Sequence, residues 1–170
     1  MTPTIVRSLL LSAGLLSAPL LAACEAVTAQ STACDGLVYK SGGPTRAEYL
    51  PCAGAMMATL DRLAPQVEDM LAGKEPARMD ARATLSELRS LLREAGWRNL
   101  LERWDDRALT SLNVEIWNAY THHDACMMVA GQLFGRAPLG DEKNREPARV
   151  ECRAYRGSYE DAKRAYRRLQ

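Results

Sequence analysis

The sequence predicts an all-α protein: an antiparallel helical bundle of about four helices, braced by disulfides, that follows a flexible N-terminal tether. Apolar residues recur at spacings of three and four in four successive segments, which is the period of an amphipathic helix. No alternating strand pattern runs beyond a few residues. Four cysteines lie within or next to these segments, at positions 34, 52, 126 and 152. We expect three regions: 1–23, 24–44 and the bundle domain, 45–170.

The first region has the character of an export signal. Arg7 and the N-terminal amine supply positive charge at the start, and the 16 residues from 8 to 23 carry no charge and are rich in leucine and alanine. A membrane-spanning helix needs roughly 20 apolar residues, so this run is too short to span comfortably. A basic start, a short apolar stretch and small residues at its end predict a secretory signal peptide.

The end of this run carries a more specific signal. Leu21-Ala22-Ala23-Cys24 resembles the lipobox of bacterial lipoproteins, in which a branched residue and two small residues precede a cysteine. The resemblance covers about the first 25 residues. It implies cleavage before Cys24, a diacylglyceryl group on its sulfur and an acyl chain, commonly palmitate, on the new amine. Glu25 follows where an aspartate would imply inner-membrane retention, so the resemblance implies the outer membrane, facing the periplasm.

An ordinary signal peptide is the alternative. Cleavage after Val27-Thr28-Ala29 would release the remainder as a soluble secreted protein. Both routes remove Cys24 from the free thiols and leave four cysteines in an oxidising compartment, a pattern that predicts two disulfides. The even number of remaining cysteines therefore supports export, but it does not distinguish a lipoprotein signal from an ordinary signal peptide.

Four cysteines allow three pairings. We favour Cys34–Cys52 with Cys126–Cys152, because each bond joins neighbouring segments of the chain. The alternative pairs Cys34 with one of the later cysteines. Zinc is a further possibility for such a set, but the C-x-x-C and H-x-x-x-H spacings of zinc sites are absent from the sequence.

The tether and the first helix meet at a turn signal. Residues 24–44 are expected to form a lipidated tether and loop that ends in Gly42-Gly43-Pro44. Thr45 and Glu48 form a possible capping box at the start of a helix that runs to about residue 71. We expect Pro51 in its first turn and a kink or a division at Pro65. Its apolar face comprises Met56, Leu60, Leu63, Ala64, Val67, Met70 and Leu71.

The second helix is predicted from about residue 78 to 95, between the stop signals Gly73 and Gly96. A short helical turn over 99–104 is expected to follow it. The apolar face of the second helix comprises Leu85, Leu88, Leu91, Leu92 and Ala95.

The third helix is the longest, from about Asp106 to residue 134, with Gly135 and Pro138 closing it. Asp106 is expected to serve the helix N-terminus, where acidic groups are favourable. The apolar positions are spaced almost like a coiled-coil seam. They are Leu109, Leu112, Ile116, Tyr120, His123, Met127, Ala130 and Phe134.

The fourth helix is expected over 146–169, with Pro147 near its start. Gly157 is a weak point, and Ser158 with Asp161 could instead begin a separate last helix. The apolar positions are Cys152, Tyr155, Tyr159, Ala162, Tyr166 and Leu169. Four helices with short connections predict an antiparallel bundle, in which the helices carrying Cys126 and Cys152 must be neighbours if that disulfide forms.

Both histidines of the chain lie in the segment 118–128. Helical geometry places His122 on one side, and His123 with Met127 on the next. Imidazole and thioether groups are ligands of copper and haem iron. The pattern therefore supports an alternative function, a metal- or haem-binding bundle that uses His122, His123 and Met127.

In that alternative, Met56 or Met57 of the first helix would be the second ligand of a non-covalent haem. The competing interpretation is core packing, because His123 falls on the apolar seam and methionine commonly fills cores. No C-x-x-C-H haem attachment sequence occurs, and the E-x-x-H pairs of di-iron bundles are absent.

Charge is distributed unevenly. Residues 143–170 contain nine Lys or Arg and four Asp or Glu, whereas residues 24–142 contain 12 and 17. A basic stripe on the last helix could contact anionic lipid headgroups, cell-wall polymer or an acidic partner. Solvation or pairing with acidic residues of the bundle is the competing interpretation. The stripe comprises Arg149, Arg153, Arg156, Lys163 and Arg167.

No phosphate loop, dinucleotide fingerprint or nucleophile elbow occurs in the sequence. We therefore expect a non-enzymatic, lipid-anchored envelope protein that serves as an interaction or envelope-maintenance component. Its expected partners are the membrane, through the lipid on Cys24, and an envelope protein or cell-wall polymer. We expect no cofactor besides that lipid, and no nucleic acid partner outside the cytoplasm.

Overall fold

The computed structural model describes residues 33–37, 43–74, 78–96, 106–136 and 142–170. The expected signal peptide, Cys24, most of the tether and the short helical turn at 99–104 lie outside the described residues. Within the described residues the chain is helical and contains no β-strand.

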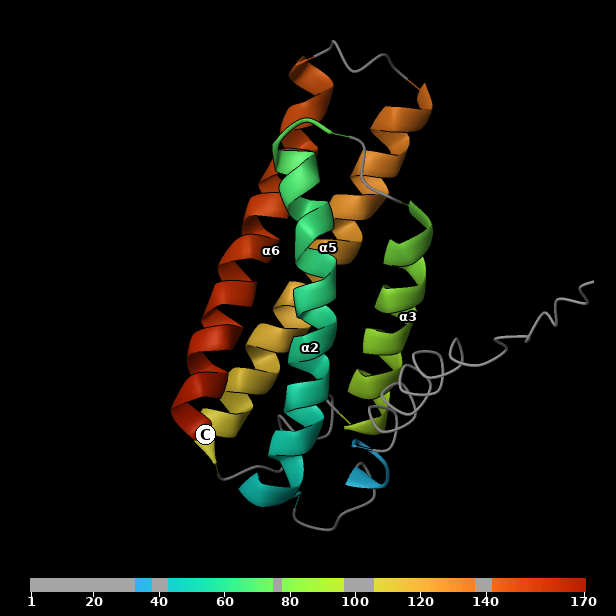
Figure 1. Ribbon diagram of the computed structural model, residues 1–170. Coiled ribbons are helices and arrows are strands. Elements are labelled where there is room, and N and C mark those ends of the chain that lie inside the picture. The colour runs from blue at the N-terminus through green and yellow to red at the C-terminus, as the bar shows by residue number, and fades with distance from the viewer. Residues whose placement is uncertain (1–32, 38–42, 75–77, 97–105, 137–141) are drawn as a thin grey trace, which may run out of the picture.

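Four helices form an antiparallel bundle (Figure 1). They run alternately up and down in the order of the chain. The predicted fold class is confirmed. The helices are α2 (Arg46–Leu71), α3 (Arg78–Glu94), α5 (Arg107–Arg136) and α6 (Glu142–Leu169).

Helix α2 packs against all three of the other described helices, α3, α5 and α6. The closest pair is α5 with α6, which form one long antiparallel hairpin. Buried residues therefore lie on more than one face of α2, because neighbouring helices pack against both sides of its apolar stripe. Its buried residues are Tyr49, Cys52, Ala53, Ala55, Met56, Met57, Thr59, Leu60, Leu63, Gln66, Val67 and Met70.

The predicted apolar faces supply most of the rest of the core. Helix α3 buries three of its four leucines, at 88, 91 and 92, and leaves Leu85 half-buried. Helices α5 and α6 bury the described part of their seams apart from two half-buried residues, Met127 and Tyr166. Burial of this apolar area is the main stabilising contribution to such a bundle, at roughly 25 cal/mol per Å². The largest fully buried side chains are Tyr49, Tyr155, Met56, Leu60, Leu63, Leu88, Leu91, Leu92, Leu109, Leu112, Ile116 and His123.

The start of α2 has the predicted capping box. The backbone N–H of Thr45 donates a hydrogen bond to the Glu48 carboxylate at 2.9 Å, and the Thr45 hydroxyl donates to the same oxygen at 2.9 Å. Gly73 and Gly96 follow α2 and α3 with φ angles of 76° and 67°, in the left-handed region that glycine adopts without steric cost. These two predicted stops are thus confirmed, whereas α5 continues through the third predicted stop, Gly135, and ends at Arg136.

The expectation for Pro51 is corrected, and of the two effects expected of Pro65 the division of the helix is excluded. The helix begins at Arg46, so Pro51 lies in its second turn instead of its first, and the helix continues past Pro65 to Leu71 without division. Each proline withholds an N–H from the carbonyl four residues earlier, at Ala47 and Asp61. All four of these residues are exposed, so water can satisfy both carbonyls.

Helix α6 begins earlier than expected. It starts at Glu142, so Pro147 lies within the helix and not at its first turn. The helix also runs through Gly157 to Leu169, which excludes a separate last helix beginning near Ser158. The long contact with α5 explains this continuity, because it stabilises the helical backbone on both sides of the glycine.

Both predicted disulfides are present. Cys34 is joined to Cys52, with the Cα atoms 4.7 Å apart, and Cys126 to Cys152, with the Cα atoms 5.0 Å apart. The first bond fastens the described segment 33–37 to the early turns of α2. The second links α5 to α6, which are neighbours as the pairing required.

The start of α5 is held to α2. Asp106 accepts hydrogen bonds from the backbone N–H groups of Ala108 at 3.0 Å and Leu109 at 3.3 Å, as expected for a cap. Its carboxylate also pairs with the Arg46 guanidinium at 2.7 Å. The hydrogen bond from Arg46 is the main reason that the pKa of Asp106 is lowered.

Candidate functional site

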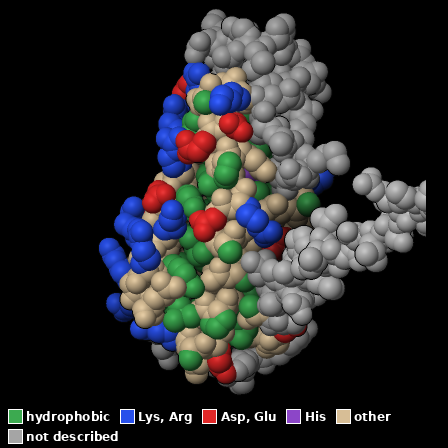
Figure 2. All heavy atoms as spheres, in the orientation of Figure 1, with side chains coloured by type: hydrophobic (Ala, Val, Ile, Leu, Met, Phe, Trp, Pro, Cys, Tyr) green, Lys and Arg blue, Asp and Glu red, His purple; other side chains and the backbone are tan. Residues whose placement is uncertain are grey.

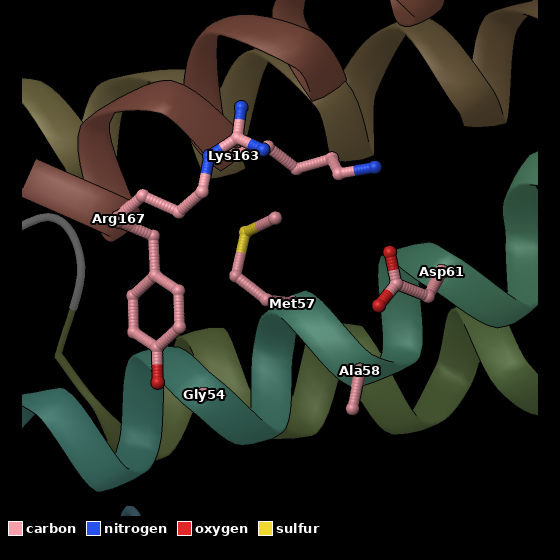
Figure 3. A pocket seen from close by; sticks show the side chains of 7 residues that line it. Gly54, Met57, Ala58, Asp61, Lys163 and Arg167 are labelled. Atoms are coloured by element: carbon pink, nitrogen blue, oxygen red, sulfur yellow. The ribbon is translucent and has the colours of Figure 1, made fainter. Parts of the chain in front are cut away.

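A small cavity opens between α2 and α6, near the end of the bundle where α6 terminates (Figure 3). Its volume is about 230 Å³. Helix α2 contributes an apolar floor and one carboxylate, and α6 contributes two cations and a phenol. The lining residues are Gly54, Met57, Ala58, Asp61, Lys163, Tyr166 and Arg167.

Gly54 allows α2 and Tyr166 to approach each other closely at this cavity. A Cβ atom at position 54 would lie 2.7 Å from the Tyr166 hydroxyl oxygen, which is shorter than a normal contact. A larger residue at position 54 would therefore displace the Tyr166 side chain and reshape the cavity.

The polar groups of the cavity differ in how strongly they are engaged. The Tyr159 hydroxyl donates a hydrogen bond to the Asp61 carboxylate, and burial is the main cause of the raised pKa of this phenol. The Lys163 ammonium lies 4.8 Å from the centre of the Tyr159 ring and 3.8 Å from the Glu160 carboxylate. Arg167 forms no ion pair with another described residue.

The predicted basic stripe of α6 is largely neutralised within the bundle. Arg153 pairs with Glu146, and Arg149 lies 4.0 Å from the same residue. Arg156 donates two hydrogen bonds to Glu68 of α2, one of them at 2.8 Å. At the C-terminal end of the stripe, beside the cavity, Lys163 is paired with Glu160, whereas Arg167 has no ion-pair partner among the described residues.

Figure 2 shows the face of the molecule that α2 and α6 form. Lys and Arg side chains line the outer edge of α6, and hydrophobic side chains lie between α6 and α2. The face thus combines an apolar strip with a basic margin. None of the described helices has the length and hydrophobicity that a membrane span requires.

His122 does not share the surroundings of His123. Its Nδ1 atom lies 2.9 Å from a Glu151 carboxylate oxygen of α6, and both side chains are partly exposed. This contact bridges α5 and α6 a short distance from the Cys126–Cys152 disulfide. The histidine is thus engaged by a carboxylate at the helix–helix interface.

His123 is fully buried in the core. Its ring meets Tyr155 of α6 edge to face, with the ring centroids 5.3 Å apart. Neither ring nitrogen has a hydrogen-bond partner among the described residues. Burial lowers the pKa of His123 from 6.5 to about 4, so the ring is neutral at pH 7.

The methionines considered as ligands also have separate surroundings. Met56 is fully buried, Met57 lines the cavity between α2 and α6, and Met127 is half-buried on α5. The described residues contain no group of three His, Cys, Asp or Glu side chains close enough to hold a metal ion. The structure therefore does not assemble the predicted residues around one described cavity.

Sequence reasoning missed the cavity and a buried polar pair. The Tyr49 hydroxyl donates a hydrogen bond to Asn113 Oδ1 at 2.9 Å in the core between α2 and α5. Asn113 directly follows the seam residue Leu112, so its burial had no periodic signal. The small residues Gly54 and Ala58, four positions apart, were the available sign of a close helix approach.

Comparison with known proteins gave no match. No protein-family model, no curated protein and no solved structure is significantly similar to the chain.

Proposed function

We propose that this protein is a lipid-anchored component of the bacterial envelope whose helical bundle acts as an interaction module. The observation that carries the proposal is the lipobox-like Leu21-Ala22-Ala23-Cys24 placed ten residues before a disulfide-bonded cysteine. Two or three acyl chains at Cys24 hold a protein on a bilayer, because each buried methylene contributes about 0.8 kcal/mol. The anchor is proposed to lie in the outer membrane, facing the periplasm.

The face between α2 and α6 is the proposed contact surface. It combines apolar groups with cations that the bundle neutralises only in part, and it includes the cavity at Gly54. An arrangement of this kind binds by surface complementarity and needs no reacting group. An acidic envelope protein, a cell-wall polymer or the membrane surface would each match the charge, and the module is proposed to be non-enzymatic.

Metabolic labelling tests the anchor. Cells expressing the full chain are grown with radioactive palmitate, alongside cells expressing Cys24→Ala. We expect label on the unaltered chain and none on the variant, with the unaltered chain in the membrane fraction. Equal labelling of the two chains would refute the anchor. Crosslinking in intact cells, followed by mass spectrometry, then identifies the partner of the α2–α6 face.

A metal- or haem-binding bundle is the second candidate. The observation that favours it is His123, whose two ring nitrogens have no partner among the described residues and whose neutral form is the one that binds metals. The absorption spectrum and elemental content of the purified chain distinguish the candidates. A Soret band or stoichiometric copper that disappears in His123→Leu would establish it.

A further inference from the structure

The cavity between α2 and α6 is sized for a headgroup. Its volume of about 230 Å³ is below the roughly 300–1,000 Å³ of pockets that enclose a drug-sized molecule. Met57 and Ala58 provide an apolar floor, and the polar groups stand on the two walls (Figure 3). The cavity therefore suits a small polar group attached to an apolar body that remains outside.

Opposite charges face the cavity from its two helices. Lys163 and Arg167 lie four residues apart on α6, hence on the same side of that helix, and Asp61 comes from α2. A ligand that carries only negative charge would be repelled by the Asp61 carboxylate. A ligand that carries only positive charge would be repelled by Lys163 and Arg167. A group that carries an anion next to a positively charged hydrogen-bond donor matches all three.

The route of the chain places this cavity near the proposed anchor. Cys34 is bonded to Cys52, which is two positions before Gly54 on α2. The ten residues from Cys24 to Cys34 span at most about 35 Å when fully extended. The segment at Cys34 and the C-terminus of α6 lie at the same end of the bundle (Figure 1). An anchored bundle would thus hold the cavity within reach of the bilayer surface.

We propose that the cavity between α2 and α6 binds the phosphoethanolamine headgroup of a membrane phospholipid. Lys163 and Arg167 contact the phosphodiester, and the Asp61 carboxylate accepts a hydrogen bond from the ammonium group. The glycerol end lies over Met57 and Ala58. This inference rests on the proposed lipid anchor for its source of ligand. It goes further by assigning the residues of one site and the lipid class that fills it.

The test uses the full chain in detergent micelles that contain trace photoactivatable phosphatidylethanolamine. Mass spectrometry then locates the adducts. A photoactivatable phosphatidylcholine with the same acyl chains is the matched probe, because its methylated ammonium cannot donate an N–H bond to Asp61. We expect adducts on peptides covering 54–61 and 163–167, with about tenfold more from the ethanolamine lipid, the effect of one charge-assisted hydrogen bond. Equal yields from both lipids would overturn the proposal.

Two paired variants separate the site from general surface charge. Lys163→Gln with Arg167→Gln removes the two cavity cations that contact the phosphodiester and should lower the adduct yield from both lipids. Arg164→Gln with Arg168→Gln makes the same charge change at the same spacing on α6, outside the cavity, and should leave both yields unchanged. Equal losses in both pairs would refute the cavity as the site, and circular dichroism confirms that each variant is folded.

Two further arms identify the source of the ligand. Excess inorganic phosphate should leave the adduct yield unchanged, and its full loss would mean that the cavity takes a free anion. The micelle assay does not require an acylated Cys24, since the probe reaches the cavity by diffusion. Adducts without palmitate labelling would support the headgroup site and refute the anchor. Palmitate labelling without adducts would support the anchor and refute the headgroup site.

Discussion

At the scale of single residues, His123 lies in the environment least suited to its charged form. The spacing of α5 predicted that it falls on the apolar seam, and the structure buries it completely against Tyr155. A protonated imidazole there would lose its hydration without gaining a partner. The periodicity could predict this burial because it depends only on helical geometry within α5.

This environment predicts a pH dependence of stability. The folded state binds the His123 proton more weakly than the unfolded state, with a pKa of about 4 against 6.5. The contribution of neutral His123 to the free energy of unfolding is therefore complete above pH 6.5 and is lost as the pH falls toward 4. When the pH falls from 7.5 to 5, we expect the protonation of His123 to lower the free energy of unfolding by about 2 kcal/mol.

Urea unfolding at the two pH values measures this effect in the unaltered chain and in His123→Leu. The leucine variant should lose about 2 kcal/mol less than the unaltered chain on acidification, because it has no group to protonate at that position. His122→Gln is the control, and we expect it to retain the dependence. An identical loss in the unaltered chain and in His123→Leu would contradict the assignment.

The buried pair of Tyr49 and Asn113 gives a second prediction at this scale. Tyr49→Phe removes the phenol and leaves Asn113 Oδ1 without that donor in the core. The free energy of unfolding at pH 7 should fall by about 1–2 kcal/mol. Tyr166→Phe serves as the control, because the Tyr166 side chain is half-buried at the cavity. An unchanged urea midpoint for Tyr49→Phe would show that the hydrogen bond contributes nothing.

At the scale of elements, the helices were predictable because their signals are local. The apolar spacing, the Thr45–Glu48 box and the glycine stops of α2 and α3 each act within a few residues, and the structure contains all three. The effect of Pro65 was not predictable, because it depends on whether the carbonyl it frees faces water or the core. The contact of Gly54 with Tyr166 depends on how α2 and α6 align, which no single segment encodes.

Two glycines within helices provide a matched pair of predictions. A Cβ atom at Gly157 would meet nothing within 4 Å, whereas one at Gly54 would meet the Tyr166 hydroxyl at 2.7 Å. Gly157→Ala should therefore stabilise the protein by about 0.5–1 kcal/mol, since alanine loses less backbone entropy on folding. Gly54→Ala should lack this gain or destabilise. Thermal unfolding of both variants checks the difference, and equal shifts in Tm would contradict it.

The disulfide between α5 and α6 contributes at the same scale. It closes a loop with a sequence separation of 26, so its removal should lower the free energy of unfolding by about 3–4 kcal/mol in the chain-entropy treatment. Cys126→Ala with Cys152→Ala, compared by urea unfolding with Cys34→Ala with Cys52→Ala, measures it. Both pairs should be destabilised by similar amounts, because the two loop lengths differ little. Full stability in either variant would contradict this expectation.

At the scale of the whole molecule, the bundle, its disulfides and its proposed anchor form one physical account. The first ten residues of the tether would connect an acylated Cys24 to Cys34, which a disulfide joins to α2 of the bundle. The sequence predicted the body because helix period and cysteine parity constrain it strongly. It predicted only part of the candidate site, namely the basic residues Lys163 and Arg167, since the cavity arises from packing between distant segments.

The most direct test is the mass of the native chain after extraction from cell membranes with detergent. We expect a mature chain that begins at Cys24, carries a diacylglyceryl group and an amide-linked acyl chain, and holds its other four cysteines in two disulfides. A chain recovered from the cytosol with Met1 intact and five reduced thiols would contradict it.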